Sequence, residues 1–545
     1  MTLFERILTA RGLATRAARQ AFLQPDYMAV KHDPFLLPDM KKAVVRLKQA
    51  REQGEKIVIY GDYDIDGLSA TALLLDAFGK FGFEGVDAFI PNRFVEGYGM
   101  TMGAVDKVCD MGADLIVTVD TGSLCHAEIA YAASLGIDTV VTDHHNVAET
   151  PPPSVAAVNP KFPGHTYPFR DLCGAGVAFK LVQALQTELD GLPDGYEKWL
   201  LDLVALGTVC DIVTLADENR ANVYWGLEVL KKQQRPGLKA LMAVAGIEPE
   251  QVNARHLGFG LGPRMNAAGR LETAQHALDM LVARDGLAAL EASEKLEELN
   301  TKRRGIQDTI FEEACMQAEE LANDRVLVVS SGGWNHGVIG IVASKLVEKY
   351  NKPVFIIGER GEEATGSARS FGDFSAADAV RAADDIIIKG GGHGAAAGVT
   401  LATEKISDFR RRVNEFYDSL QLTNQERYLL PRADVEIDDF SEIDEELVEN
   451  LAKMEPFGNG NPEPVVKITT ASVLSARRMG ADGQHVKLTL RDQNGKALQM
   501  LAFNAPEAFF CEPGDEVVAW FQPTINEWQG VRTVEGRLVH MALLD

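Results

Sequence analysis

The stretch KIVIYGDYDIDGLSA, residues 56–70, decides the fold of this chain. Its apolar residues 57–60 run without interruption into Gly61, and an apolar helical pattern begins after Gly67. A short unbroken run that is rich in β-branched residues is typical of a strand buried on both faces of a parallel sheet. Loops at the carboxyl ends of such strands form the binding crevice of open α/β sheets. The sequence therefore predicts a buried parallel strand that leads directly into a binding crevice.

Three carboxylates follow this strand within five residues: Asp62, Asp64 and Asp66. Carboxylates crowded in this way repel one another unless a cation lies between them. Taken alone, they fit an exposed acidic turn as well as a metal site, so the choice depends on the rest of the chain.

Strand and helix patterns alternate from residue 44 to about residue 230. Further strands are predicted at residues 86–90, 115–119, 139–142 and 155–158, with helical patterns between them such as residues 102–111 and 127–135. This alternation predicts an α/β domain with a mainly parallel sheet and helices on both faces.

Metal-binding residue types recur where these predicted elements end. One strand is followed by Asp120, the next by the triplet DHH at residues 143–145, and an apolar helical run leads to Asp211. Each residue alone has a structural explanation, as a cap, a turn residue or a buried histidine, but the recurrence favours one cluster. We expect the following side chains to converge on one edge of the sheet: Asp62, Asp64, Asp120, His144 and Asp211.

A cluster of aspartates and histidines without cysteine is an oxygen-rich site, which favours Mn²⁺ or Mg²⁺ over copper and leaves zinc open. Because the carboxylates outnumber the needs of one cation, we expect two metal ions that share a carboxylate. Two cations roughly 3.5–4 Å apart activate water and stabilise the leaving oxygen in a displacement at phosphorus. The predicted reaction class is therefore phosphoester hydrolysis.

Glycine-rich segments supply further polar residues. Residues 256–271, HLGFGLGPRMNAAGRL, are expected to form a glycine-rich loop whose arginines and backbone amides bind phosphate. Two long helical patterns follow, residues 273–299 and 303–322, and predict a helical connector. A second α/β unit carries the motifs GSARS and GGGHG, and the segment PFGNGNPEP at residues 456–464 is read as a turn-rich linker.

Short alternating runs after residue 464, such as residues 486–490 and 517–521, predict a small antiparallel β-barrel. Turns are expected at residues 481–483 and 529–530. The full expectation is thus a parallel-sheet domain, a helical connector, a second α/β domain and a C-terminal β-barrel.

Composition narrows the class of protein. The 545 residues are 46% hydrophobic and 24% charged, which is ordinary for a globular protein of about three domains. Six scattered cysteines without CxxC spacing favour a reducing cytoplasm and count against structural zinc or disulfides. The sequence shows neither a signal peptide at its start nor a run of membrane-spanning length. A net charge of −25 excludes nucleic-acid binding by overall charge but permits a local basic groove.

The motifs resemble the DHH phosphoesterase family. The segments GDYDIDG, IPNRFVEGYG, VTVD, DHH and GTVCDIV resemble its catalytic motifs, and GSARS and GGGHGAAAG resemble the associated DHHA1 domain. LGPRMNAAGRL and PFGNGNPEP narrow the resemblance to the RecJ family, bacterial 5′→3′ exonucleases specific for single-stranded DNA. The resemblance covers nearly the whole chain, and its motifs occur in the family's order.

This resemblance implies a division into domains and a set of roles. The domains would be a leader at 1–45, a DHH catalytic domain at 46–272, a connector at 273–323, a DHHA1 domain at 324–430, a linker at 431–463 and an oligonucleotide/oligosaccharide-binding (OB) barrel at 464–545. The implied metal ligands are Asp62, Asp64, Asp120 as the bridge, His144 and Asp211, with His145 beside the scissile phosphate and Asp66 beside the metals.

The resemblance also implies substrate contacts. Arg93, Ser367 and Arg369 would face a 5′-terminal phosphate, and Arg264, Asn266, Arg270 and His393 would line the groove. In the barrel, Arg477, Arg478 and Trp528 are the candidates for DNA contact, whereas Trp520 and Phe521 fit the barrel core equally well. The family suggests a cytoplasmic enzyme that acts with a single-strand-binding protein and with repair and recombination enzymes.

Two positions depart from the family pattern: Thr121 replaces an asparagine, and Ala368 replaces a glycine. Two functions other than an exonuclease are open to a chain with these motifs. Another DHH-type phosphodiesterase, acting on short oligonucleotides, would be much shorter and would lack the barrel. A catalytically inactive DNA-binding scaffold would have lost metal ligands that are all present here.

Overall fold

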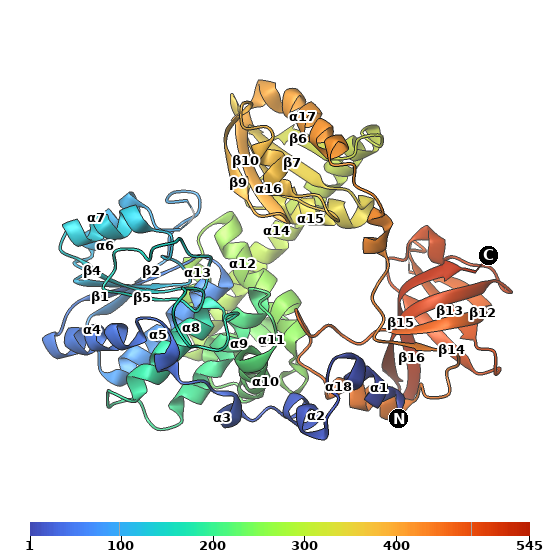
Figure 1. Ribbon diagram of the computed structural model, residues 1–545, viewed down its shortest axis with the longest axis horizontal. Helices are drawn as coiled ribbons and strands as arrows, with labels where there is room; N and C mark the ends of the chain where they lie inside the picture. Colours follow the sequence, from blue (N-terminus) through green and yellow to red (C-terminus); the bar gives the residue numbers. More distant parts are fainter. Residues whose placement is uncertain (98, 481, 545) are drawn as a thin grey trace.

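The computed structural model describes residues 1–97, 99–480 and 482–544. A five-stranded parallel sheet with the order β2-β1-β3-β4-β5 forms the centre of the first domain (Figure 1). Its strands are β1 (Ile57–Gly61), β2 (Val86–Phe89), β3 (Leu115–Val119), β4 (Asp138–Thr142) and β5 (Ala156–Val158). The predicted α/β domain with a parallel sheet is therefore confirmed.

Helices cover both faces of this sheet. They are α4 (Met40–Gln53), α5 (Ile65–Phe81), α6 (Met102–Asp110), α7 (His126–Ser134) and α8 (Gly174–Gln186). Farther from the sheet, α9 (Leu201–Cys210) packs on α5 and α8, α10 (Asp217–Lys231) packs on α9, and α11 (Pro236–Val244) packs on the helices that follow it. Alternate residues of β1 belong to different apolar clusters: Ile57 and Ile59 pack with α5, α8 and α9, whereas Val58 and Tyr60 pack with α6 and α7. Burial on both faces explains why the strand is uniformly apolar.

The strand register brings the ends of three strands level. Gly61 lies opposite Val119, and Val119 lies opposite Thr142. The residues that follow each strand therefore emerge at the same edge of the sheet.

The segment that follows is mainly helical. Its elements are a π-helix (His256–Leu261), α12 (Gly262–Leu271), α13 (Gln275–Val282) and α14 (Gly286–Glu320). The expected glycine-rich loop at residues 256–271 is wrong, because its glycines serve close packing: a Cβ at Gly262 would lie 2.9 Å from the carbonyl oxygen of Leu257. The backbone amides in this segment point along the helix and are not free to bind phosphate.

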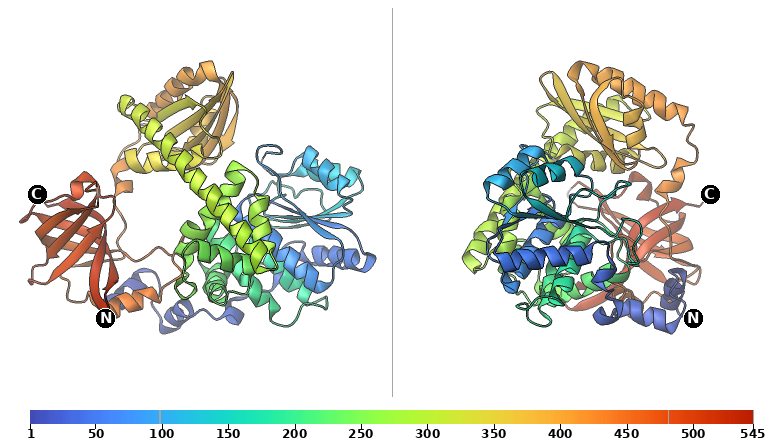
Figure 2. Two further views of the ribbon diagram at one scale, coloured as in Figure 1. Left: turned by 180° about the vertical axis from the view of Figure 1, so that it is seen from behind. Right: turned by 60° about the vertical axis from the view of Figure 1, so that its left-hand side comes forward.

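The connector also differs from the expectation. The two helical patterns at residues 273–299 and 303–322 become the short α13 and one continuous α14, which runs from the first domain to the second (Figure 2). The helix continues through residues 300–302, where we expect a break, because the buried side chain of Arg303 donates hydrogen bonds to Asn300 and Gln307.

The second α/β domain has a mixed sheet with the order β6-β7-β8-β10-β9. Its elements are β6 (Leu327–Gly332), α15 (Ile339–Tyr350), β7 (Val354–Arg360), β8 (Glu363–Arg369), α16 (Ala376–Arg381), β9 (Ile387–Gly392), β10 (Ala396–Ala402) and α17 (Ile406–Ser419). Only β6 and β7 run parallel in the described part of this sheet. Helices α14 and α15 pack on one face, and α16 and α17 on the other.

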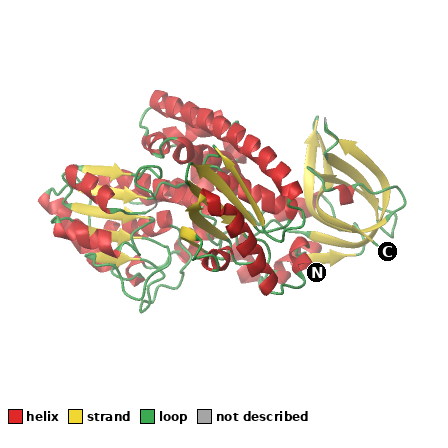
Figure 3. Cartoon of the chain, turned by 90° about the horizontal axis from the view of Figure 1, so that it is seen from above, coloured by secondary structure: helices red, strands yellow, loops and turns green. Residues whose placement is uncertain are grey.

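The C-terminal domain is a closed barrel (Figure 3). It comprises β11 (Val435–Ile437), α18 (Glu445–Ala452), β12 (Val466–Met479), β13 (His485–Arg491), β14 (Ala497–Ala502), β15 (Glu516–Trp528) and β16 (Val531–Leu543). Strand β12 pairs with both β13 and β15, which closes the barrel. The turn at Gln529 and Gly530 is present, with φ of 50° and 78°. The other expected turn includes residue 481, which lies outside the described residues.

The leader, residues 1–45, divides between two domains. It contains α1 (Leu3–Ala10), α2 (Arg16–Leu23) and α3 (Tyr27–Val30). We expect a leader helix on the catalytic domain, and α3 does contact α10, but Leu3, Ile7 and Leu8 of α1 are buried in the barrel core. The N-terminus therefore lies beside the C-terminal domain (Figure 1).

The turn-rich segment at residues 456–464 packs closely on the catalytic domain. The side chain of Asn459 donates a hydrogen bond to the carbonyl oxygen of Ile212 (2.8 Å), and its backbone carbonyl oxygen accepts one from the Leu215 amide (2.8 Å). Arg220 of α10 donates to the carbonyl oxygens of Glu455 and Pro456. The barrel is thus attached beside the segment that follows Asp211. In the described part of the chain, no helix is both long and apolar enough to cross a membrane.

Candidate active site

The level ends of β1, β3 and β4 carry Asp62, Asp120 and Asp143 to one edge of the sheet. Asp64 caps α5: its Oδ1 accepts the backbone N–H of Asp66 (2.9 Å) and Gly67 (3.2 Å). The other carboxylate oxygen of Asp64, Oδ2, takes no part in this cap and can bind a ligand.

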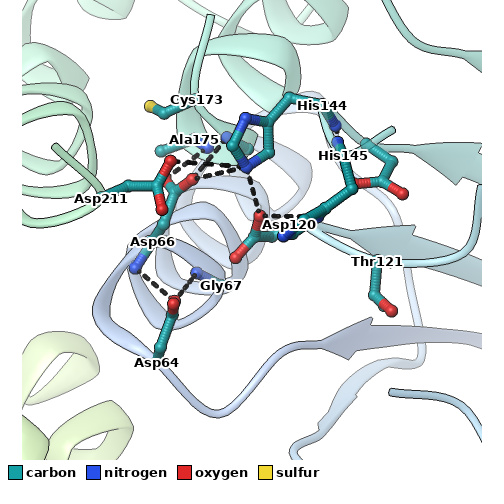
Figure 4. Close-up of polar contacts among 12 residues, drawn as sticks. Asp64, Asp66, Gly67, Asp120, Thr121, His144, His145, Cys173, Ala175 and Asp211 are labelled. Atoms are coloured by element: carbon teal, nitrogen blue, oxygen red, sulfur yellow. Dashed lines mark hydrogen bonds and ion pairs between the residues drawn. The ribbon is translucent and has the colours of Figure 1, made fainter. Parts of the chain in front are cut away.

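The ligand atoms form three overlapping groups, within each of which they lie no more than 4.8 Å apart. The groups are Asp62, Asp64 and Asp120; Asp66, His144 and Asp211; and Asp120, His144 and His145. His144 Nε2 lies 3.0 Å from Asp120 Oδ1 and 3.5 Å from Asp211 Oδ2 (Figure 4). Asp120 therefore lies between the pair Asp62 and Asp64 and the pair His144 and Asp211.

Unpartnered polar atoms at this place test whether metal ions fit. Asp62 Oδ1, Asp120 Oδ1 and His144 Nε2 are buried and make no hydrogen bond, although the last two atoms lie 3.0 Å apart. Buried polar atoms are otherwise nearly always paired, so three unpaired acceptors in one cluster need a common partner. Carboxylate oxygens with imidazole nitrogen suit Mn²⁺ or Mg²⁺, and the two-sided position of Asp120 suits two ions.

The pKa values of the clustered side chains also indicate that the carboxylates need a bound cation. Burial and the charge of Asp64 raise the pKa of Asp62 to about 7, and burial with the charge of Asp66 raises the pKa of Asp211 to about 8. Burial and the same neighbours raise the pKa of Asp120 well above its ordinary value. Burial, followed by the charge of His145, lowers the pKa of His144 to about 3, which keeps the imidazole neutral as a ligand.

Asp66 is held by the beginning of α8. It is fully buried and accepts backbone N–H groups from Gly174 and Ala175, the latter at 2.8 Å. The same glycine admits Asp120, because a Cβ at Gly174 would lie 2.5 Å from the Asp120 Cβ. Asp120 itself has a φ of 59°, an uncommon backbone conformation for a residue other than glycine. The sequence offered no signal for this support, since Gly174 lies far from the aspartates along the chain.

His145 is positioned by Asp143. Its Nδ1 lies 2.9 Å from Asp143 Oδ1, and Asp143 is fixed in turn by the backbone N–H of Ser123 (2.9 Å) and of His144 (2.7 Å). Burial lowers the pKa of His145, but the hydrogen bond and charge of Asp143 outweigh burial and raise that pKa to about 9. In the metal-free protein, Asp143 therefore favours the protonated form of this half-exposed ring.

Thr121, which departs from the family pattern, lies in the turn directly after Asp120. Its backbone carbonyl accepts a hydrogen bond from the Thr118 hydroxyl (2.7 Å). This bond needs no particular side chain at position 121.

An arginine cluster lies between the two α/β domains. Burial, followed by the nearby charges of Arg93, Arg303 and Arg369, lowers the pKa of Arg270 to about 10. Arg270 bridges the domains by donating to the carbonyl oxygen of Gly337 (2.8 Å). Arg369 donates to the Ser367 hydroxyl (3.2 Å). Several arginines held together by the fold form a site for an anion.

The arginine cluster contains the expected Arg93, Arg270 and Arg369, and also Arg303, which the sequence does not single out. Arg93 stacks on the Tyr63 ring, with its guanidinium carbon 4.6 Å from the ring centre, so it approaches the aspartate loop. Arg303 was not expected, because one arginine on a long charged helix carries no signal in the sequence.

Other expected contacts lie elsewhere. Arg264 pairs with Glu297 of α14 and hydrogen-bonds the carbonyl oxygen of Gly260, so it ties two helices together. His393 lies in the exposed turn between β9 and β10. On the barrel, Arg478 lies over the Phe510 ring at 3.6 Å and Trp528 is 71% exposed at the tip of the β15–β16 hairpin, whereas Trp520 and Phe521 are buried.

A cavity of about 920 Å³ continues from the arginine cluster toward the barrel. Its lining includes Asn266, Arg270 and Arg303 near the catalytic edge, and Arg537 of β16 at the barrel. The cavity therefore lies between the arginine cluster and the C-terminal domain, beside the segment that carries Asp211.

Three segments of the chain match known protein families. Residues 56–208 match the model of the DHH family N-terminal domain, residues 323–419 the DHHA1 domain, and residues 433–540 the RecJ OB domain.

Curated relatives match over most of the chain. The chain is 40% identical over 529 residues to the single-stranded-DNA-specific exonuclease RecJ of Bacillus subtilis, covering 96% of this chain and 65% of that protein. It is 34% identical over 526 residues to the protein of the same name from Escherichia coli, covering 92% of this chain and 89% of that protein.

Solved structures show the same likeness. The crystal structure of RecJ from Thermus thermophilus in complex with Mn²⁺ matches with a TM-score of 0.83 at 30% identity, covering 99% of this chain and 76% of that chain. The structure of RecJ from the same organism in complex with Mg²⁺ matches with a TM-score of 0.75 at 27% identity, covering 98% and 74%.

Proposed function

Because the chain belongs to the RecJ family of single-stranded-DNA-specific exonucleases, we propose that it hydrolyses single-stranded DNA from its 5′ end and releases mononucleotides. The observation that carries this proposal is the cluster of unpaired metal-ligand atoms at the edge of the first sheet, next to arginines contributed by both α/β domains. The first feature suits phosphodiester hydrolysis, and the second suits the recognition of a phosphate.

We propose Asp62, Asp64, Asp120, His144 and Asp211 as ligands of two Mn²⁺ or Mg²⁺ ions, with Asp120 shared. Two such ions, when bound, activate a water molecule and stabilise the leaving oxygen at phosphorus. Asp66, which accepts hydrogen bonds from the backbone N–H groups of Gly174 and Ala175, would keep the neighbouring ligands in position. His145, kept protonated by Asp143, would donate a hydrogen bond to the scissile phosphate.

We propose that Arg369, Ser367 and Arg93 bind the 5′-terminal phosphate. Arg369 and Ser367 lie together at the end of β8, and a Cβ at Gly340, at the start of α15, would lie only 3.0 Å from the Ser367 hydroxyl. The beginning of a helix adds backbone N–H groups and a positive dipole to the arginines. If the start of α15 blocks the far end of this site, the site would accept a chain terminus and exclude an internal phosphate, in keeping with exonuclease polarity.

Wider aspects of the function rest on the family. We propose that the enzyme acts in the cytoplasm in DNA repair and recombination, together with a single-strand-binding protein. The barrel would add affinity for long single strands.

The experiment that tests the proposal is digestion of 5′- and 3′-labelled single-stranded and duplex DNA in Mn²⁺ or Mg²⁺. We expect mononucleotides from the 5′ end of the single strand and little digestion of the duplex. Asp120→Ala, which removes the shared ligand, should lower the rate by several orders of magnitude. Asp110→Ala, an exposed aspartate at the end of α6, serves as the matched control.

Digestion of oligonucleotides only a few residues long, with no activity on longer strands, would instead identify a phosphodiesterase for short oligonucleotides. An Asp120→Ala variant that kept more than a tenth of the activity would contradict the assignment of the site.

A further inference from the structure

We propose that Phe259 and Ile212 form an apolar wall on which bases of the single strand stack as the strand passes from the active site toward the barrel. The inference rests on the proposed function and adds the group that binds the bases, since arginines account only for the phosphates.

Both side chains are unusually exposed for their type. Phe259 is 81% exposed and Ile212 is 69% exposed, and both line the cavity of about 920 Å³ that leads from Asn266 toward Arg537. Removing large apolar side chains from water is favourable, so two of them left exposed in one cavity indicate a ligand with an apolar surface.

The charge around the wall matches a polyanion. Arg255, Arg270 and Arg303 line the same cavity, although the chain as a whole carries a net charge of −25. Of the two glutamates in the lining, Glu463 is neutralised by its ion pair with Arg537. An apolar wall among arginines is the arrangement that binds alternating bases and phosphates of a single strand.

Helical backbone fixes the position of Phe259 relative to the arginine cluster. It lies in the π-helix that continues directly into α12, the helix that carries Asn266 and Arg270. Arg255, one turn earlier, lies over the Phe259 ring, with its guanidinium carbon 5.9 Å from the ring centre. π-Helical turns cost hydrogen-bond quality and occur frequently at functional sites.

Ile212 is held in a strained conformation. Its φ is 58°, which is a genuine outlier for a β-branched residue. The strain persists because Asn459 binds the Ile212 carbonyl oxygen at 2.8 Å and Asp211 precedes it in the candidate metal cluster. Such strain concentrates where a side chain must be presented to a ligand, and here it presents Ile212 to the cavity.

The wall also favours single-stranded over duplex DNA. In a duplex the base faces are already stacked on their neighbours, so they cannot lie against Phe259. Because every base has a π-face, the wall binds single strands with little preference for sequence.

The test combines protein variants with substrates that lack one base. A series of DNA strands is prepared in which each strand has one abasic residue, at successive positions from the 5′ end. Fluorescence anisotropy in EDTA measures the binding of each strand to the wild type, Phe259→Ala and Phe259→Leu. Phe35→Ala, an exposed phenylalanine of the leader, is the matched control. The same strands are then digested in Mn²⁺.

For the wild type and for Phe35→Ala, we expect one or two positions at which loss of the base weakens binding by roughly 5- to 100-fold. Phe259→Ala should bind intact DNA more weakly by a similar factor and should be insensitive to base loss at those positions. Phe259→Leu, which keeps an apolar side chain without a ring, should fall between the two.

Equal sensitivity of the wild type and Phe259→Ala to base loss, while the wild type still digests single strands from the 5′ end, would overturn the inference alone. A wild type that neither bound nor digested single-stranded DNA would overturn the proposed function and the inference together.

Discussion

Arg369 is the residue on which the proposed 5′-phosphate pocket depends most directly. Its guanidinium is held by the Ser367 hydroxyl and by the Ala368 carbonyl oxygen, and burial lowers its pKa without removing its charge. We expect Arg369→Ala to reduce the preference for 5′-phosphorylated over 5′-hydroxyl DNA by roughly tenfold or more, because a charge-assisted bond is lost. The measurement is kcat/KM on both substrates.

Arg411, an exposed arginine on α17, provides the control for Arg369. Arg411→Ala should keep the wild-type preference for the 5′-phosphate. An Arg369→Ala enzyme with an unchanged preference would show that the terminal phosphate is bound elsewhere.

Asp211 makes the stability of the metal-free protein depend on pH. Burial and the charge of Asp66 raise its folded-state pKa from 3.8 to about 8. Between these values the folded protein retains a proton that the unfolded chain has released, so this group's contribution to stability is lost as the pH rises through about 8. Asparagine does not titrate, so Asp211→Asn should gain stability relative to the wild type between about pH 5 and pH 8.

Urea unfolding in EDTA across this pH range measures the effect of Asp211→Asn, and Asp110→Asn is the control. Excess Mn²⁺ should reverse the order, because a bound ion stabilises the wild type through its ligands. A stability difference between Asp211→Asn and wild type that did not vary with pH in EDTA would contradict the raised pKa.

Among the helices and strands, α14 joins the two α/β domains. Its 35 residues span about 50 Å and connect the two α/β domains. Gly305 lies exposed in its middle, and a Cβ there would meet nothing within 4 Å. Because glycine disfavours a helix interior, Gly305→Ala should stabilise the protein by about 0.5–1 kcal/mol.

The same substitution at Gly207 of α9 should have the opposite sign. A Cβ at Gly207 would lie 2.4 Å from Asp66 Oδ1, so Gly207→Ala should destabilise the protein and disturb the site. Thermal unfolding of both variants checks the pair of predictions. A lower melting temperature for Gly305→Ala would show that this helix requires its glycine.

At the scale of the whole molecule, the barrel is integrated with the rest of the chain. Its core includes Leu3, Ile7 and Leu8 from the N-terminus, and residues 456–464 pack beside Asp211. A chain that ended at residue 462 would expose α1 and α18, so truncation would disturb more than DNA binding. Point substitutions on the barrel surface are the better test of its role.

We therefore expect the combined substitutions Arg477→Ala, Arg478→Ala and Trp528→Ala to weaken binding of long single strands and to reduce the salt dependence of that binding. Loss of one stacked base costs about 1–3 kcal/mol, and each lost phosphate contact lowers the salt slope. Digestion of very short oligonucleotides should be nearly unchanged. Equal impairment on short and long strands, measured across a salt series, would mean that the barrel supports the catalytic core instead.

The sequence was sufficient where the determining interactions are local. The β-branched runs before Asp62 and Asp120 predicted buried strands, because a strand covered on both faces requires apolar residues throughout. The aspartates and histidines at the ends of these strands predicted one cluster, because parallel strands align their carboxyl ends. The family motifs added the roles of these residues, and the order of domains followed from the same patterns.

Tertiary packing decided the features that depend on residues distant in the chain. Gly174 and Ala175 hold Asp66, Arg303 joins the arginine cluster, and α1 completes the barrel core through contacts that leave no periodic pattern in the sequence. The segment at residues 256–271 resembles a glycine-rich loop by composition, yet close packing makes it helical, since glycine serves a tight contact as well as a turn. The exposure of Phe259 and the strain at Ile212 likewise exist only in the folded chain, because the cavity they line is built by segments that lie far apart in the sequence.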